Sequence, residues 1–173
     1  MKKILKISAL IAAMALTCVF FGCTPGNSSD DGNSTSSFAD CTSTATEVTL
    51  ADGNWTLKHV MNGDGVSLEK NIKATVTNGS YSFTSGTGTL SADLSQAQGG
   101  IGGVPKGATV TRDGTKVTAT GAYDAEELAE MQSRMDLSEL PNSATIKTNS
   151  DNTKYIISYT EEGITYTIYV SKD

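Results

Sequence analysis

The chain is poor in the residue types that most catalytic and metal sites need. Its 173 residues include one histidine, three cysteines, three prolines and only 6% aromatic residues. A metal site needs several His, Cys or carboxylate ligands together, and a serine or cysteine nucleophile needs a base within reach. Neither grouping is visible, so we expect no enzyme activity, no cofactor and no bound metal. Acidic pairs that converge only in space leave no sequence signature, and they are the one route to a hydrolase that stays open.

Other absences narrow the class of protein. The sequence has no glycine triplet repeat, no heptad repeat and no second long apolar run, which excludes collagen, a coiled coil and a protein with several membrane spans. Positive charge is scarce, with 13 basic against 19 acidic residues. Without the first 22 residues the balance is ten against 19, a net charge of −9. An acidic chain repels phosphate backbones, so we exclude nucleic acid as a partner.

The N-terminus has the pattern of a bacterial lipoprotein signal. Lysines at positions 2, 3 and 6 precede an apolar run over 7–22, which is typical of a signal peptide. The end of that run, Phe20-Phe21-Gly22-Cys23, resembles a lipobox, which implies cleavage after residue 22 and acylation of Cys23. Ordinary secretion, an uncleaved anchor and cleavage before Cys18 are the alternatives. Several acyl chains hold a soluble domain on a bilayer, so the membrane is an expected partner.

We expect the protein in the bacterial cell envelope, lipid-anchored. Thr24 does not supply the aspartate that retains some lipoproteins at the inner membrane, which favours the outer membrane, with periplasmic and surface faces both open. Residues 23–46 are rich in Ser and Thr and have no apolar periodicity, so the sequence predicts a disordered tether. Cys41, in this tether, is expected to be a free thiol or an intermolecular bridge. The oligomeric state is open.

From Glu47 onward the sequence predicts an antiparallel β domain over 47–173. Apolar and polar residues alternate with period 2, and the dipeptides Asn78-Gly79 and Asp113-Gly114 are suited to two-residue type I′ hairpins. One helix is expected at about 124–137, where Asp124 and Glu127 are spaced as a capping box. The nine predicted strands are 47–50, 55–61, 72–77, 81–90, 108–112, 115–122, 144–148, 154–161 and 164–171.

The tripeptide Gly53-Asn54-Trp55, at the start of a long strand, resembles the Gly-x-Trp opening of the lipocalin and fatty-acid-binding (calycin) families. The resemblance implies a lipocalin-like β-barrel whose interior takes a small apolar molecule. Calycins commonly pack a basic residue from near the C-terminus over this tryptophan, and the chain offers only Lys172 or Lys154. The residues alone indicate a mainly all-β fold, an antiparallel meander of about 8–9 strands with one short helix, as a barrel or a sandwich.

Alternation along the strands puts one set of mainly apolar and aromatic side chains on a common face. These residues either wall a pocket or simply fill the core, and His59 would be a polar anchor in a pocket or a hydrogen-bonded structural residue. The function we favour is binding of a small apolar or amphipathic ligand. The alternative is a surface adhesin or protein-interaction lipoprotein with a filled core. The candidate pocket residues are Trp55, Leu57, His59, Phe83, Val117, Tyr155, Tyr159, Tyr166 and Ile168.

Overall fold

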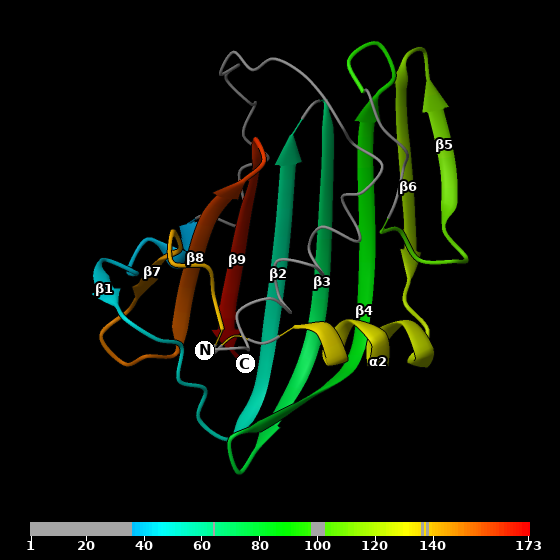
Figure 1. The fold of residues 1–173 in the computed structure, drawn as a ribbon. Coiled ribbons are helices and arrows are strands. Elements are labelled where there is room, and N and C mark those ends of the chain that lie inside the picture. The colour runs from blue at the N-terminus through cyan, green and yellow to red at the C-terminus, as the bar shows by residue number, and fades with distance from the viewer. Residues whose placement is uncertain (1–35, 64, 98–102, 136, 138) are drawn as a thin grey trace, which may run out of the picture.

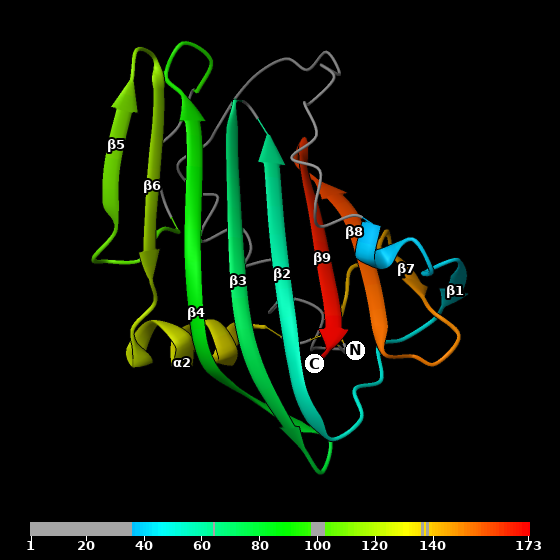
Figure 2. The same ribbon diagram turned by 180° about the vertical axis from the view of Figure 1, so that it is seen from behind.

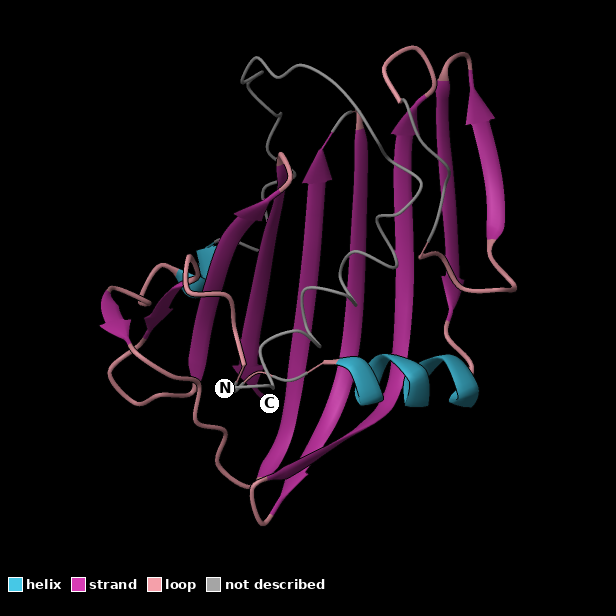
Figure 3. Ribbon diagram, viewed as in Figure 1, coloured by secondary structure: helices cyan, strands magenta, loops and turns pink. Residues whose placement is uncertain are grey.

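The computed structural model describes residues 36–63, 65–97, 103–135, 137 and 139–173 (Figure 1). The predicted signal peptide over 1–22 and the predicted acylation site Cys23 lie outside the described residues. Within the described part, the chain forms one antiparallel sheet with a short 3-10 helix and one α-helix (Figure 3). The prediction of a mainly β fold with about nine strands and one α-helix is therefore confirmed.

The elements are η1 (Ser36–Phe38), β1 (Ser43–Ala45), β2 (Gly53–Gly63), β3 (Val66–Thr77), β4 (Ser80–Asp93), β5 (Thr109–Asp113), β6 (Lys116–Ala122), α2 (Ala125–Arg134), β7 (Thr145–Thr148), β8 (Lys154–Glu161) and β9 (Ile164–Lys172). Their order across the sheet is β1-β7-β8-β9-β2-β3-β4-β6-β5. The first long strand, β2, pairs with the last strand, β9, at the middle of the sheet.

The sheet is open, which corrects the expectation of a closed barrel or a two-sheet sandwich. The first long strand, β2, pairs with the last strand, β9, inside the sheet. The two edge strands are β5 and β1, and they do not pair with each other, so the sheet does not close. Figures 1 and 2 show these strands at opposite sides of the molecule. Closure needs β5 to pair with β1 or β7, and no such pairing occurs among the described residues.

Two-residue turns close the β3–β4, β5–β6 and β8–β9 hairpins. Asn78 and Gly79 both have positive φ (53° and 74°), as a type I′ turn requires, and so do Glu162 and Gly163 (51° and 83°). The β5–β6 turn differs from the prediction. Its central residues are Gly114 and Thr115, and only Gly114 has positive φ (59°), so it has the pattern of a type II′ turn with glycine at the first central position.

The folded part begins earlier than the sequence indicated. Residues 43–45, within the predicted tether, form β1 and pair with β7, and Cys41 is buried. The predicted strand at 47–50 is not a strand. Its side chains nevertheless pack on the core through Val48 and Leu50. Contacts with residues more than 100 positions away order this segment, and local alternation cannot reveal such contacts.

The helix α2 begins with the predicted capping box: the Asp124 side chain accepts a hydrogen bond from the Glu127 backbone, and the Glu127 side chain accepts one from the Asp124 backbone. Leu128 and Met131 face the sheet and join its largest apolar cluster. The helix packs on β4 beside Gly86, where an added Cβ would lie 3.2 Å from Leu128. We call the side of the sheet that α2 covers the helix face, and the opposite side the outer face.

Candidate functional site

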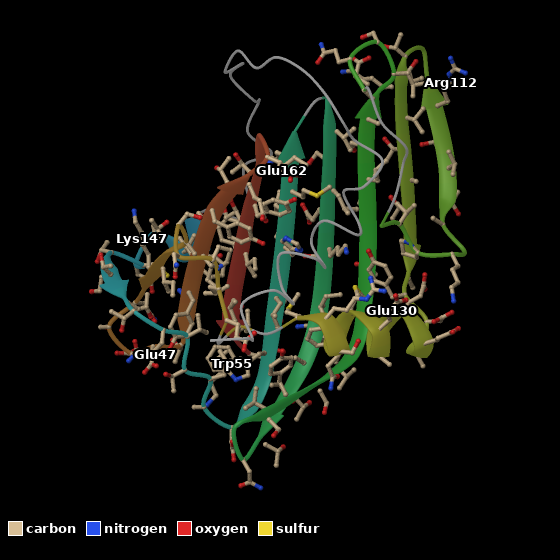
Figure 4. The ribbon with its side chains drawn as sticks, in the orientation of Figure 1. Glu47, Trp55, Arg112, Glu130, Lys147 and Glu162 are labelled. Atoms are coloured by element: carbon tan, nitrogen blue, oxygen red, sulfur yellow. The ribbon has the colours of Figure 1, made fainter. Side chains whose placement is uncertain are left out.

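Most of the candidate residues lie on the helix face, as the alternation predicted. Trp55 and Leu57 of β2, Tyr155 of β8 and Ile168 of β9 are buried in one apolar cluster, with Phe83 packed against it. Figure 4 shows Trp55 toward the end of β2 that lies level with α2. This end of the helix face is apolar and continuous with the underside of the helix.

The two aromatic residues at this end use their polar atoms on the preceding loop. Trp55 Nε1 donates to the carbonyl oxygen of Ala51 at 2.8 Å, and the Tyr155 hydroxyl donates to that of Thr49 at 2.8 Å. The two rings lie 6.5 Å apart in a tilted arrangement. Lys172 is the ladder partner of Trp55 on β9, whereas Lys154 forms an ion pair with Asp40. Buried and fully hydrogen-bonded, these rings anchor the 49–51 loop on the sheet.

A second group of candidates forms an aromatic stack. Tyr159 and Tyr166 are ladder partners on β8 and β9, with ring centroids 4.8 Å apart and planes 13° apart. The His59 ring lies 6.1 Å from Tyr166, nearly parallel to it. Burial raises the pKa of Tyr159, with smaller contributions from Tyr166 and Glu161. The stack therefore continues from β8 across β9 to the centre of the sheet.

The centre of the helix face is polar. His59 on β2 and Lys70 on β3 are ladder partners, and Lys70 is only 6% exposed. Burial, with a smaller contribution from the Arg134 charge, lowers the pKa of Lys70 to about 8. Burial, with a smaller contribution from Lys70, lowers the pKa of His59 to about 4, so the imidazole is neutral at neutral pH.

The His59 side chain also holds a polar atom without a partner. Its Nε2 is shielded from solvent and makes no hydrogen bond within the described part of the chain. Leaving a buried polar group unsatisfied costs about 1–3 kcal/mol, so such atoms are uncommon in folded proteins and call for an explanation. Among the candidates, His59 is the residue with a buried side-chain polar atom that has no hydrogen-bond partner in the described residues.

Two residues depart from the predicted set. Val117 is buried but lies on β6, separated from β2 by β3 and β4, so the structure does not bring it to the other candidates. Lys70 was missed, because the sequence placed the start of this strand at residue 72 whereas β3 begins at Val66. Extending the alternation backward from Ile72 puts Lys70 and Leu68 on the helix face, and that signal could have found Lys70.

The outer face has a different chemistry. On neighbouring strands β4, β6 and β5, Thr89, Thr120 and Thr109 are ladder partners in one row. The Thr120 hydroxyl donates to that of Thr89 at 3.3 Å, and both Thr120 and Thr109 are exposed. Nearer the centre of the sheet, Lys58 and Glu69 form an ion pair at 3.0 Å. The outer face is therefore polar, and its threonine hydroxyls are aligned across neighbouring strands.

Within the described residues, no group of three or more His, Cys, Asp or Glu side chains is placed to hold a metal ion. None of the helices that the structure describes is long and apolar enough to cross a membrane. Comparison with protein-family models, with curated proteins and with solved structures finds no match.

Proposed function

We propose that this chain is an extracytoplasmic lipoprotein, acylated at Cys23, that binds a small apolar or amphipathic molecule against the helix face of its sheet. The observation that carries the proposal is His59, whose shielded Nε2 makes no hydrogen bond to the described residues and which lies beside Lys70 on a face whose other candidate residues are apolar or aromatic. Ligand sites combine an apolar lining with a few placed polar groups, and this face has both.

The parts of the site divide by chemistry. The aromatic stack of Tyr159 and Tyr166 and the apolar cluster around Leu57 suit a hydrocarbon or ring system. A neutral imidazole has one donor and one acceptor nitrogen. His59 can therefore donate a hydrogen bond to, or accept one from, a hydroxyl, carbonyl or carboxyl group of the ligand. Lys70, its ladder partner, adds positive charge at the same place. Together they favour a molecule with an apolar body and one polar end.

Photo-cross-linking tests ligand binding on the intact lipoprotein in its membrane. The probe is a fatty acid that carries a diazirine on its chain, and the labelled peptides are mapped by mass spectrometry. We expect labels in the peptides of β2, β8 and β9 that contain Leu57, Tyr159 and Tyr166, competed by unlabelled fatty acid. Labels that resist competition, or that fall only on outer-face residues, would count against the proposal.

Matched variants test the polar contact. His59→Leu keeps an apolar side chain of similar bulk and removes both nitrogens, so we expect the competing fatty acid to bind about three- to tenfold more weakly, the range of one net hydrogen bond. Thr87→Leu makes a leucine of an exposed residue on β4 and should leave competition unchanged. Equal competition in the two variants would remove His59 from the site.

The anchor is tested separately. Cys23→Ser removes the thiol that acylation needs, so the variant should lose incorporation of radioactive palmitate and move from the membrane to the soluble fraction. Cys41→Ser, which removes a cysteine buried in the domain, should keep both. Palmitate incorporation that survives Cys23→Ser would contradict acylation at this residue.

A second function, adhesion through the outer face, is favoured by the threonine row Thr89–Thr120–Thr109. Hydroxyls repeated on neighbouring strands, about 4.8 Å apart, can bind a repeating polar surface such as a polysaccharide. Replacing Thr109 and Thr120 by lysine would then abolish adhesion of cells that display the protein and leave fatty-acid labelling of the helix face intact. The reverse result would support the ligand-binding function alone.

A further inference from the structure

The strand β5 is an open edge of the sheet. Within the described residues it pairs only with β6 (Figures 1 and 2), and all five of its residues are exposed. Native proteins usually protect such edges with proline, inward-pointing charges, bulges or a covering segment. In β5, charge is confined to Arg112 and Asp113, next to the turn, and the sequence Thr-Val-Thr that precedes them is well suited to strand pairing. Figure 4 shows Arg112 near that turn end of the strand.

An apolar row on the helix face ends at this edge. Ladder partners on successive strands place Leu68, Leu90, Ala119 and Val110 in line across β3, β4, β6 and β5. Leu90 is 1% exposed and Ala119 3%, but Val110 is 64% exposed. The apolar layer therefore continues to the rim of the sheet and stops there uncovered.

The backbone of Val110 is also directed outward. The two-residue turn between Asp113 and Lys116 closes on a hydrogen-bonded pair, and hydrogen-bonded pairs alternate with non-hydrogen-bonded pairs along an antiparallel ladder. Thr111 and Thr109 are thus bonded to β6, whereas Arg112 and Val110 direct their N–H and C=O groups away from it. The most exposed apolar side chain of the strand and its free backbone groups occur at the same residue.

We propose that β5 pairs antiparallel with β5 of a second copy of this chain, with Val110 opposite its own counterpart across a twofold axis. This register forms two backbone hydrogen bonds between the Val110 residues and continues the row Leu90–Ala119–Val110 into the same row of the second copy. On the outer face it puts Thr109 opposite Thr111, so threonine meets threonine. Arg112 lies opposite Ala108, away from any like charge.

Neighbouring registers fit less well. A shift that puts Thr111 on the axis pairs Val110 with Arg112, and a further shift pairs Arg112 with Arg112, where like charges repel. A shift in the other direction pairs Val110 with Ala108 and ends the apolar row on a smaller side chain. Among these registers, only the one centred on Val110 pairs valine with valine and gives both Thr109 and Thr111 a threonine partner, and this complementarity argues for a second copy rather than an unrelated strand.

Cysteine cross-linking tests this register in the full-length lipoprotein in its membrane. In a hydrogen-bonded antiparallel pair the Cα atoms lie about 5.5 Å apart, within reach of a disulfide. Val110→Cys should therefore form a disulfide-linked dimer on mild oxidation. The controls Thr109→Cys and Arg112→Cys are on the same exposed strand but do not face their own counterparts, and they should cross-link at least about tenfold more slowly. Equal rates in the three variants would overturn the proposed register.

Sedimentation of the full chain in mild detergent tests whether the dimer exists. Val110→Lys puts two lysines opposite each other and should weaken dimerisation by about tenfold or more, since opposed like charges at a strand pair disfavour it. The control Thr120→Lys adds the same charge on β6, one strand in from the edge, and should leave dimerisation unchanged. A monomeric parent protein, a dimer insensitive to Val110→Lys, or cross-linking of Val110→Cys to a different protein would each refute the proposal.

Discussion

His59 is a buried titratable group on the helix face, so its protonation affects the stability of the fold. Its pKa in the folded protein is about 4, below the ordinary value of about 6.5, so the unfolded chain binds more protons between these two values. Stability should therefore be fully present above about pH 6.5 and fall as the pH drops to about 4. The free energy of unfolding loses about 3 kcal/mol across this window from His59 alone.

The variant His59→Phe isolates this contribution. Phenylalanine keeps a flat ring against Tyr166 and cannot titrate, so urea unfolding at a series of pH values should show a smaller loss of stability between about pH 6.5 and 4 than in the parent. Above that window the two stability curves should run parallel. Curves that stay parallel throughout would show that the imidazole titrates normally in the folded protein.

Gly88 permits the close approach of the loops that cover the helix face. A Cβ at this position would lie 2.8 Å from the Tyr123 ring and 2.9 Å from Pro105. Gly88→Ala should therefore destabilise the protein by about 1–3 kcal/mol through overpacking, measured by urea unfolding. Gly107→Ala, where an added Cβ meets nothing within 4 Å, is the matched control and should change stability by less than about 0.5 kcal/mol. Equal effects would mean that the Tyr123 side of the fold is loosely packed.

For a single residue, the sequence was sufficient to predict which face of the sheet its side chain lies on, but not which side chains of neighbouring strands surround it. Counting alternate positions from Trp55 put His59 on the apolar side, and the structure agrees. The neighbour that shifts its pKa, Lys70, lies on another strand, and its position depends on where β3 begins. A polar residue in a strand can be assigned to a face by periodicity, whereas the charge beside it is set by register with the next strand.

The helix α2 depends on its first turn, where Asp124 accepts a hydrogen bond from the Glu127 backbone at 2.8 Å. Asp124→Ala removes this acceptor and should destabilise the protein by about 1 kcal/mol, whereas Asp124→Asn keeps an acceptor and should retain most of the stability. Urea unfolding measures both, with Asp52→Ala, an exposed acid outside any helix, as the control. A loss in Asp124→Asn equal to that in Asp124→Ala would point to charge rather than capping.

At the scale of elements, the predictions succeeded where the cause is local. Alternation and turn residues sufficed for most strands, and the capping box sufficed for the start of α2, because these signals act within a few positions. The ends of β2, β3 and β4 extend beyond the predicted strands because long neighbours continue the ladder. Likewise, the β5–β6 turn is centred one residue later than its Asp-Gly signal suggested, since the pairing of Asp113 with Lys116 places Gly114 first.

At the scale of the whole molecule, the open sheet and the ordered start of the domain were beyond the sequence. The sheet stays open because β5 and β1 do not pair, and strand pairing between segments far apart in the sequence is not encoded in any local pattern. In the same way, composition predicted a disordered tether up to residue 46. The structure instead packs Phe38 on Tyr169 with ring centroids 5.2 Å apart, and Lys154 Nζ donates to the Ser37 carbonyl at 2.7 Å.

The docking of this N-terminal segment can be followed through Cys41. Its thiol is 5% exposed, and burial raises its pKa, so it should react with a maleimide only when the segment detaches. Phe38→Ala removes the ring that packs on Tyr169 and should speed labelling by about tenfold, a loss of the size expected for one aromatic contact. Thr42→Cys, exposed at the next position, should label rapidly in either background. If residues 36–46 were a disordered tether, Cys41 in the parent would react as fast as Thr42→Cys, and Phe38→Ala would change nothing.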